Sequence, residues 1–207
     1  MAAVDGAAKP YPSFPRVKTV VFGLALLPAV ILADDYAGGG LARPWKAIIE
    51  ETGAWSMRFL VLAVCISPLI RLTGLTAFAS FRRMIGLFGA FYAALHLVAW
   101  MRQYGFDWPF LAEELLSRRY LTVGGIAVLL LAPLAATSAD VMHRVLGAVR
   151  WRRLHVLIYP TVIAAFIHFE MARGLLRLEV AADAVLLAVA FLLRRRAGAA
   201  KSRAPAL

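Results

Sequence analysis

The 207-residue chain has one cysteine and few charged residues, and each of these shortages excludes a class of protein. Cys65 on its own can form no internal disulfide and cannot build a cysteine-based zinc site. The C-x-x-C-H motif is missing as well, which excludes covalent attachment of a cofactor through that motif. Only 17% of the residues are charged, whereas 62% are hydrophobic and the mean hydropathy is +0.74. Soluble domains are about 45–50% apolar, so these values indicate a polytopic membrane protein.

Sequence motifs of self-sufficient enzymes are also missing. The chain contains no G-x-S-x-G nucleophile elbow, no H-E-x-x-H zinc motif and no phosphate-binding loop. Its net charge of +11 would suggest nucleic acid in a soluble protein, but here most basic residues lie between apolar runs. We interpret them as topology signals and as contacts with anionic membrane lipids. We therefore expect no catalytic site within the chain and no nucleic-acid partner.

Six apolar runs organise the chain, and each contains about 16–20 residues, close to the ~20 that a helix needs to cross a bilayer. The runs cover residues 17–33, 54–70, 84–101, 120–139, 154–172 and 178–193. This pattern predicts an all-α membrane bundle of six transmembrane helices. The expected organisation is a cytoplasmic N-terminal segment over 1–16, one transmembrane domain over 17–193 and a basic cytoplasmic tail over 194–207.

The distribution of basic residues predicts how the six helices are oriented. Fifteen lysines and arginines lie in the two termini and in the second-to-third and fourth-to-fifth connections, whereas eight lie on the other side. The side richer in lysine and arginine is normally cytoplasmic. Both termini are therefore expected in the cytoplasm, and the segments 34–53 and 102–119 are the main outer connections.

Three of the four histidines lie within or beside the apolar runs. His96 is inside the third run, and His155 and His168 stand near the two ends of the fifth. His143 belongs to a basic connection, where we expect it to be solvated. Ionisable side chains are costly in a membrane and tend to mark functional sites. Neutral imidazole is also a common ligand of haem iron.

Depth counted along the helices places His96 and His168 at nearly one level. His96 is twelve residues from the inner boundary at Met84, and His168 is fourteen from Leu154. These spacings correspond to about 18 and 21 Å at a rise of about 1.5 Å per residue. Two imidazoles at one level on two helices have the geometry of bis-histidine haem ligation. Hydrogen bonds between helices would explain the same pattern, and the residues alone leave both explanations open.

A second polar pair lies near the inner boundary. His155 is at the inner end of the fifth run, and the residue of matching depth on the third helix is Arg82. Arg82 precedes His96 by fourteen residues, which places the two close to the same helix face. This low pair could hold a second haem, or bind a flavin or a haem propionate through Arg82. The alternative is that Arg82 only marks the membrane boundary.

Four stretches of the sequence carry a resemblance to a known family. They are TGAWSMRFLVLAVCISPLIRLTG, RRMIGLFGAFYAALH, RRYLTVGGIAVLLLAPLAATS and WRRLHVLIYPTVIAAFIHF. These stretches resemble the MsrQ (YedZ) family of haem-binding membrane subunits, which is part of the wider ferric reductase and NADPH-oxidase transmembrane group. The likeness extends over residues 52–169, with motifs in four separate predicted helices.

The resemblance implies a b-haem electron carrier in the bacterial inner (cytoplasmic) membrane. It would pass electrons from the quinone pool or a cytoplasmic flavin reductase to a periplasmic molybdopterin-containing methionine-sulfoxide reductase, which repairs oxidised proteins. The family's histidines correspond to His96, His168 and His155, and Arg82 stands where the wider group often has a fourth histidine. The expected cofactor is one haem b on His96 and His168, with a second at His155 left open. A flavin, FMN, is also associated with the family.

Two other classes of protein stay open on the residues alone. A proton-coupled transporter would need buried acidic groups, for which Glu179 and Asp183 are the candidates. An assembly or scaffold protein without a redox group would leave the histidines as packing residues. The absorption spectrum of the purified protein separates both classes from the electron carrier.

Overall fold

The computed structural model describes residues 15–174 and 177–202, and within these residues the chain is helical, with no strand. The helices are α1 (Pro15–Ala37), α2 (Pro44–Thr73), α3 (Ala79–Gln103), α4 (Trp108–Ser117), α5 (Arg119–Ala136), α6 (Asp140–His155), α7 (Ile158–Arg173) and α8 (Leu178–Ser202), with a short 3-10 helix over Thr76–Phe78. The all-α prediction is confirmed. Most of the predicted N-terminal segment 1–16, and residues 203–207 of the predicted tail, lie outside the described residues.

Four of the described helices are long and apolar enough to cross a membrane, namely α1, α2, α3 with its preceding 3-10 helix, and α5. The pair α6 and α7 meets the same criterion only as one unit, bent by 42° at the break between the helices, which brings the total to five. α8 is not among these candidates, although its 25 residues include the sixth predicted run. The six-span topology with cytoplasmic termini therefore stays a prediction.

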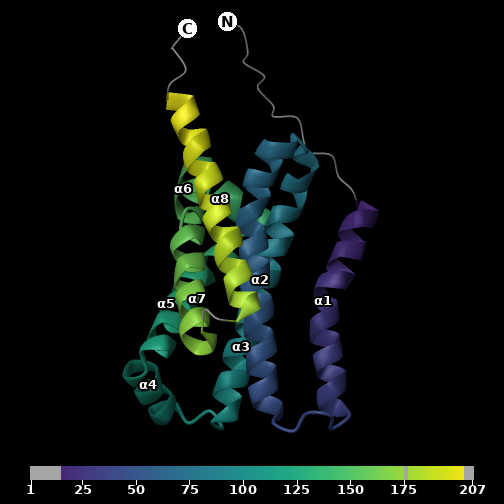
Figure 1. Cartoon of the computed structure of the whole chain (residues 1–207), viewed down its shortest axis with the longest axis vertical. Helices are drawn as coiled ribbons and strands as arrows, with labels where there is room; N and C mark the ends of the chain where they lie inside the picture. The colour runs from purple at the N-terminus through teal and green to yellow at the C-terminus, as the bar shows by residue number, and fades with distance from the viewer. Residues whose placement is uncertain (1–14, 175–176, 203–207) are drawn as a thin grey trace, which may run out of the picture.

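The long helices run along the longest axis of the molecule, and α4 lies at one end of the bundle (Figure 1). The connection between α1 and α2 and the ends of α3 and α7 lie at this same end, which we call the α4 end. α8 finishes at the opposite end, and α1 begins in the half of the bundle nearer to it (Figure 1). In the predicted orientation the α4 end is the outer end, because the connections 34–53 and 102–119 meet there.

Several helices extend beyond the apolar runs that predicted them. α2 begins at Pro44, ten residues before the second run, and proline suits a first helical turn because the N–H groups there lack helical partners. The same helix ends at Thr73, and the following Gly74 has a φ of 70°, which favours glycine, and donates its N–H to Ile70 O. α6 begins at Asp140, well before the fifth run, and contains a non-helical Gly147 with a φ of 72°.

α4 is an additional short helix inside the predicted outer connection 102–119. The Asp107 carboxylate accepts a hydrogen bond from the Phe110 N–H at 3.2 Å, and Pro109 stands in the first turn. Both features are ordinary signals of a helix start. Leu111 is buried and anchors the helix to the bundle. A search for membrane-spanning runs overlooks such an element, because ten residues are too few to span a bilayer.

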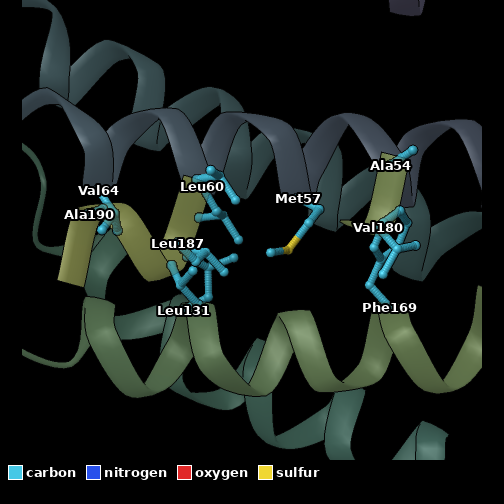
Figure 2. Close-up of a cluster of buried hydrophobic side chains, with 11 residues drawn as sticks. Ala54, Met57, Leu60, Val64, Leu131, Phe169, Val180, Leu187 and Ala190 are labelled. Atoms are coloured by element: carbon cyan, nitrogen blue, oxygen red, sulfur yellow. The ribbon is translucent and has the colours of Figure 1, made fainter. Parts of the chain in front are cut away.

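The core is built around α2, which packs most closely against α3 and also contacts α7 and α8. One buried cluster joins α2 to α5, α7 and α8, and Met57, Leu60 and Leu187 belong to it (Figure 2). Gly89 on α3 allows the close approach of α2, because a Cβ there would lie 2.8 Å from Leu60 Cδ2. The Ser56 hydroxyl donates to Gly89 O at 2.9 Å. Small residues and interhelical hydrogen bonds are the usual means by which membrane helices associate.

α1 is the most loosely packed of the candidate spans, and one tyrosine of α3 fixes it. Ala25 is its only buried residue. The Tyr92 hydroxyl donates to Ala25 O at 2.8 Å and accepts from the Ala29 N–H at 3.2 Å. It thereby bridges the two backbone groups that a regular helix would join, beside the internal Pro28.

Candidate functional site

The two histidines predicted at one level lie next to each other in the structure. His96 belongs to α3 and His168 to α7, and their ring centres are 6.0 Å apart with planes inclined at 77°. His96 stands seven residues before the end of α3, and His168 stands five before the end of α7. Since both of these helix ends lie at the α4 end of the bundle, the histidine pair is close to that end (Figure 1).

Each of these imidazoles is oriented by a backbone carbonyl. His96 Nδ1 lies 2.8 Å from Ile49 O, and His168 Nδ1 lies 2.7 Å from Tyr120 O. A carbonyl oxygen only accepts hydrogen bonds, so both Nδ1 atoms carry the hydrogen and both Nε2 atoms keep a lone pair in the neutral ring. A metal ligand requires that lone pair, and a hydrogen bond from the other ring nitrogen fixes the orientation of the ligand.

A glycine stands behind each imidazole, four residues after the carbonyl that binds the ring. On α2, a Cβ at Gly53 would lie 2.9 Å from His96 Nδ1. On α5, a Cβ at Gly124 would lie 2.7 Å from His168 Nδ1. Any larger residue at either position would therefore displace the ring. α2 supports the histidine of α3 in the same way that α5 supports the histidine of α7.

His96 and His168 are the residues that would hold a haem iron, through the two Nε2 atoms that the carbonyls leave free. The ring centres of His96 and His168 are 6.0 Å apart, so the two residues are close enough to hold one metal together. In the part of the chain that the structure describes, no group of three or more His, Cys, Asp or Glu side chains could hold a metal ion. Haem iron needs only two ligands from the protein, because the porphyrin supplies four nitrogens.

His155 and Arg82, predicted as the inner pair, form no pair comparable to His96 and His168. His155 Nε2 lies 3.2 Å from the Thr137 hydroxyl, and its ring stacks on Trp151 with ring centres 3.8 Å apart. Arg82, exposed on α3, is within electrostatic reach of His155. His143 is exposed and lies on the same helix as His155, with its ring centre 5.1 Å from that of Trp151. The surroundings of His155 therefore contain no second imidazole from another helix that could pair with it as a metal ligand.

The supports of the histidine pair were not among the sequence-predicted site residues. They are the carbonyls of Ile49 and Tyr120 and the two glycines, Gly53 and Gly124. The glycines did carry a signal, because a glycine inside a helical apolar run costs stability and usually has a packing or functional reason. The sequence did not indicate which side chain each glycine accommodates.

The acidic residues considered for a transporter both lie on α8. Glu179 is engaged in ion pairs with Arg58 and Arg173. Asp183 is buried, with 7% of its surface exposed, and lies near Arg58. Both carboxyl groups therefore interact electrostatically with Arg58.

The chain is similar to known membrane proteins over most of its length. Residues 52–166 match the family described as Ferric reductase like transmembrane component. A relative from Xanthomonas euvesicatoria pv. vesicatoria, named Protein-methionine-sulfoxide reductase heme-binding subunit MsrQ, is 42% identical, and the match covers 78% of each chain. Relatives of the same name from Polaromonas naphthalenivorans and Rhodospirillum rubrum are 37% and 39% identical, over 84% and 74% of this chain and 80% and 75% of their own lengths.

Proposed function

The chain belongs to the MsrQ family of ferric-reductase-like membrane proteins, and on this premise we propose that it is a transmembrane electron-transfer subunit of a methionine-sulfoxide reductase system. The observation that carries the proposal is the pair His96 and His168, whose Nδ1 atoms are held by carbonyls while both Nε2 atoms are left to bind iron. A bound haem b supplies a one-electron ferric/ferrous couple. The protein's own contribution is to fix the two imidazoles and to surround them with apolar helices.

The position of the histidine pair favours electron delivery at the α4 end. His96 and His168 lie about 10 and 8 Å from the ends of their helices, at about 1.5 Å per residue. The partner that we propose there is a periplasmic methionine-sulfoxide reductase with a molybdopterin cofactor. It would dock on the outer connections 34–53 and 102–119, where exposed Glu113 and Arg119 contribute charges of both signs. A mixed, small surface suits transient electron-transfer contacts, which bury less than about 1,200 Å².

Electrons would enter from the quinone pool or from a cytoplasmic flavin reductase in the bacterial inner membrane. His96 and His168 are about 20 Å from the inner membrane boundary. A cytoplasmic donor therefore needs an intermediate redox centre, such as a second haem b or bound FMN. His155 and Arg82 are the residues that we assign to binding this intermediate cofactor. His155 would have to leave the Thr137 hydroxyl before its Nε2 could bind iron. A quinol that reaches the outer pair within the membrane needs none of these residues.

The absorption spectrum and haem content of the purified protein test the proposal. Protein expressed with haem available should be red, with a low-spin b-type spectrum. His96→Ala and His168→Ala should each abolish or grossly disturb this spectrum, because six-coordinate low-spin iron needs both imidazoles. His143→Ala is the matched control and should change nothing, since its exposed ring only packs against Trp151.

Two results would refute the proposal. A colourless unaltered protein would favour a transporter or a scaffold instead. A wild-type spectrum with full haem content in both the His96→Ala and the His168→Ala proteins would show that the pair does not ligate iron.

A further inference from the structure

Three charged side chains form a cluster beside the histidine pair, and we call them the outer ion cluster. They are Arg58 on α2, Arg173 at the end of α7 and Glu179 in the first turn of α8. The Glu179 carboxylate accepts a hydrogen bond from Arg58 Nη2 at 3.2 Å and another from Arg173 Nη1. Arg173 is the most buried member, with 14% of its side chain exposed, against 35% for Arg58 and 27% for Glu179. These three side chains together carry one net positive charge, and buried Asp183, which interacts electrostatically with Arg58 and Glu179, is a second carboxyl group nearby.

Arg173 is tied to the same stretch of backbone that orients His96. Its Nη2 donates to Glu50 O at 2.8 Å, and the neighbouring carbonyl, Ile49 O, holds His96 Nδ1 at 2.8 Å. The guanidinium also lies over the ring of Phe169, 5.3 Å from its centre, and Phe169 directly follows the second histidine of the pair. Arg173 is therefore within electrostatic reach of the site at which iron would bind.

A purely structural role explains the ion pairs only in part. The cluster joins α7 and α8 to α2, but a charged side chain withdrawn from water is expensive, and apolar contacts often join helices with no loss of stability. A fixed charge near a redox centre has a second effect. Reduction adds one electron to the iron and forms or breaks no bond at the cluster. The free energy of that step therefore includes the interaction of the added negative charge with the fixed charges nearby.

We propose that the outer ion cluster sets the reduction potential of the iron held by His96 and His168, with Arg173 raising the potential and Glu179 limiting that rise. The inference rests on the proposed function, because it requires a bound haem. The positive charge of Arg173 stabilises the reduced state through surroundings from which water is largely excluded. Glu179 opposes this effect because it neutralises part of the arginine charge. Since Arg173 is little exposed, salt should screen its effect only weakly.

A redox titration of the purified full-length protein tests the inference, with haem absorption recorded as dithionite is added. Arg173→Gln should lower the midpoint potential and Glu179→Gln should raise it, so the two substitutions act with opposite sign. Arg173→Lys keeps the charge, and its potential should stay closer to that of the unaltered protein than the potential of Arg173→Gln. Lys46→Gln is the matched control, because Lys46 is a cation of the same end with 60% of its side chain exposed. Its small effect should vanish at high salt.

The outcomes separate this inference from the proposed function. Unchanged potentials in Arg173→Gln and Glu179→Gln proteins that retain haem, or shifts of the same sign, would overturn the inference alone. Equal potentials for lysine and glutamine at position 173 would also overturn it, because hydrogen-bond geometry and not charge would then be the cause. If Arg173→Gln does not retain haem, the sign of the Glu179→Gln shift decides. An unaltered protein without haem would overturn the proposed function and the inference together.

Discussion

Replacing Gly124 by alanine should displace His168 from the position in which it can bind iron. The added Cβ would lie 2.7 Å from the imidazole Nδ1 and 2.9 Å from Cε1. Non-bonded heavy atoms are most stable at about 3.5 Å or more, so the ring would have to move by roughly 0.8 Å. A shift of that size takes Nδ1, now 2.7 Å from Tyr120 O, out of good hydrogen-bond geometry. Gly53→Ala should act on His96 in the same way, with a slightly smaller shift because that Cβ would lie 2.9 Å away.

The magnitude follows from the hydrogen bond that is lost. A ring N–H left without a partner in an apolar environment costs about 1–3 kcal/mol. If the protein without haem relaxes around the new methyl group, the cost is borne only by the haem-bound state. It then corresponds to a loss of about 5- to 150-fold in the binding constant of haem. Alanine is the better helix former by about 0.5–1 kcal/mol, so neither α2 nor α5 should lose helix stability through the substitution itself.

The assay is the haem-to-protein ratio and the low-spin spectrum of each purified variant, with helix content measured by circular dichroism. Gly86→Ala is the matched control, because it lies on α3 with His96 and its Cβ would meet only Ala63 Cβ at an ordinary 3.9 Å. Gly53→Ala and Gly124→Ala should lose haem while keeping their helix content, and Gly86→Ala should keep both. Full haem content with an unaltered spectrum in the first two variants would refute the reasoning, and so would an equal loss of haem in the control.

Three further predictions address the electron path and the topology. His155→Ala should slow reduction of the outer haem by a cytoplasmic flavin reductase in a stopped-flow experiment while leaving the outer spectrum intact; an unchanged rate with that donor would remove His155 from the path. A reporter that is active only in the periplasm should give no signal when fused after Leu207, and a strong signal there would overturn the predicted orientation. Charge reversal of exposed Glu113 on α4, compared with Arg144→Glu at the opposite end, should slow electron delivery to the proposed periplasmic partner, and equal rates would show that the docking surface lies elsewhere.

The sequence by itself determined that this chain is a helical membrane protein, because local chemistry dictates that outcome. Backbone groups in a bilayer must be paired within a helix, so apolar runs of sufficient length predict helices wherever they occur. The helical rise then places His96 and His168 at one level without any knowledge of their surroundings. The short apolar span of α4 gave no such signal, and the break between α6 and α7 depends on packing that composition does not report.

Only the tertiary structure decided what holds the two imidazoles and what lies beside them. His96 meets a carbonyl 47 residues away and His168 one 48 residues away, while Arg58 meets Glu179 across 121 residues. Such contacts depend on which helices are neighbours and on how each is rotated about its axis, and hydrophobic patterning constrains neither strongly in a bilayer, where most helix faces are apolar. The role of Gly53 and Gly124 also depends on the tertiary structure, because the absence of a Cβ matters only when another side chain occupies the space that it leaves.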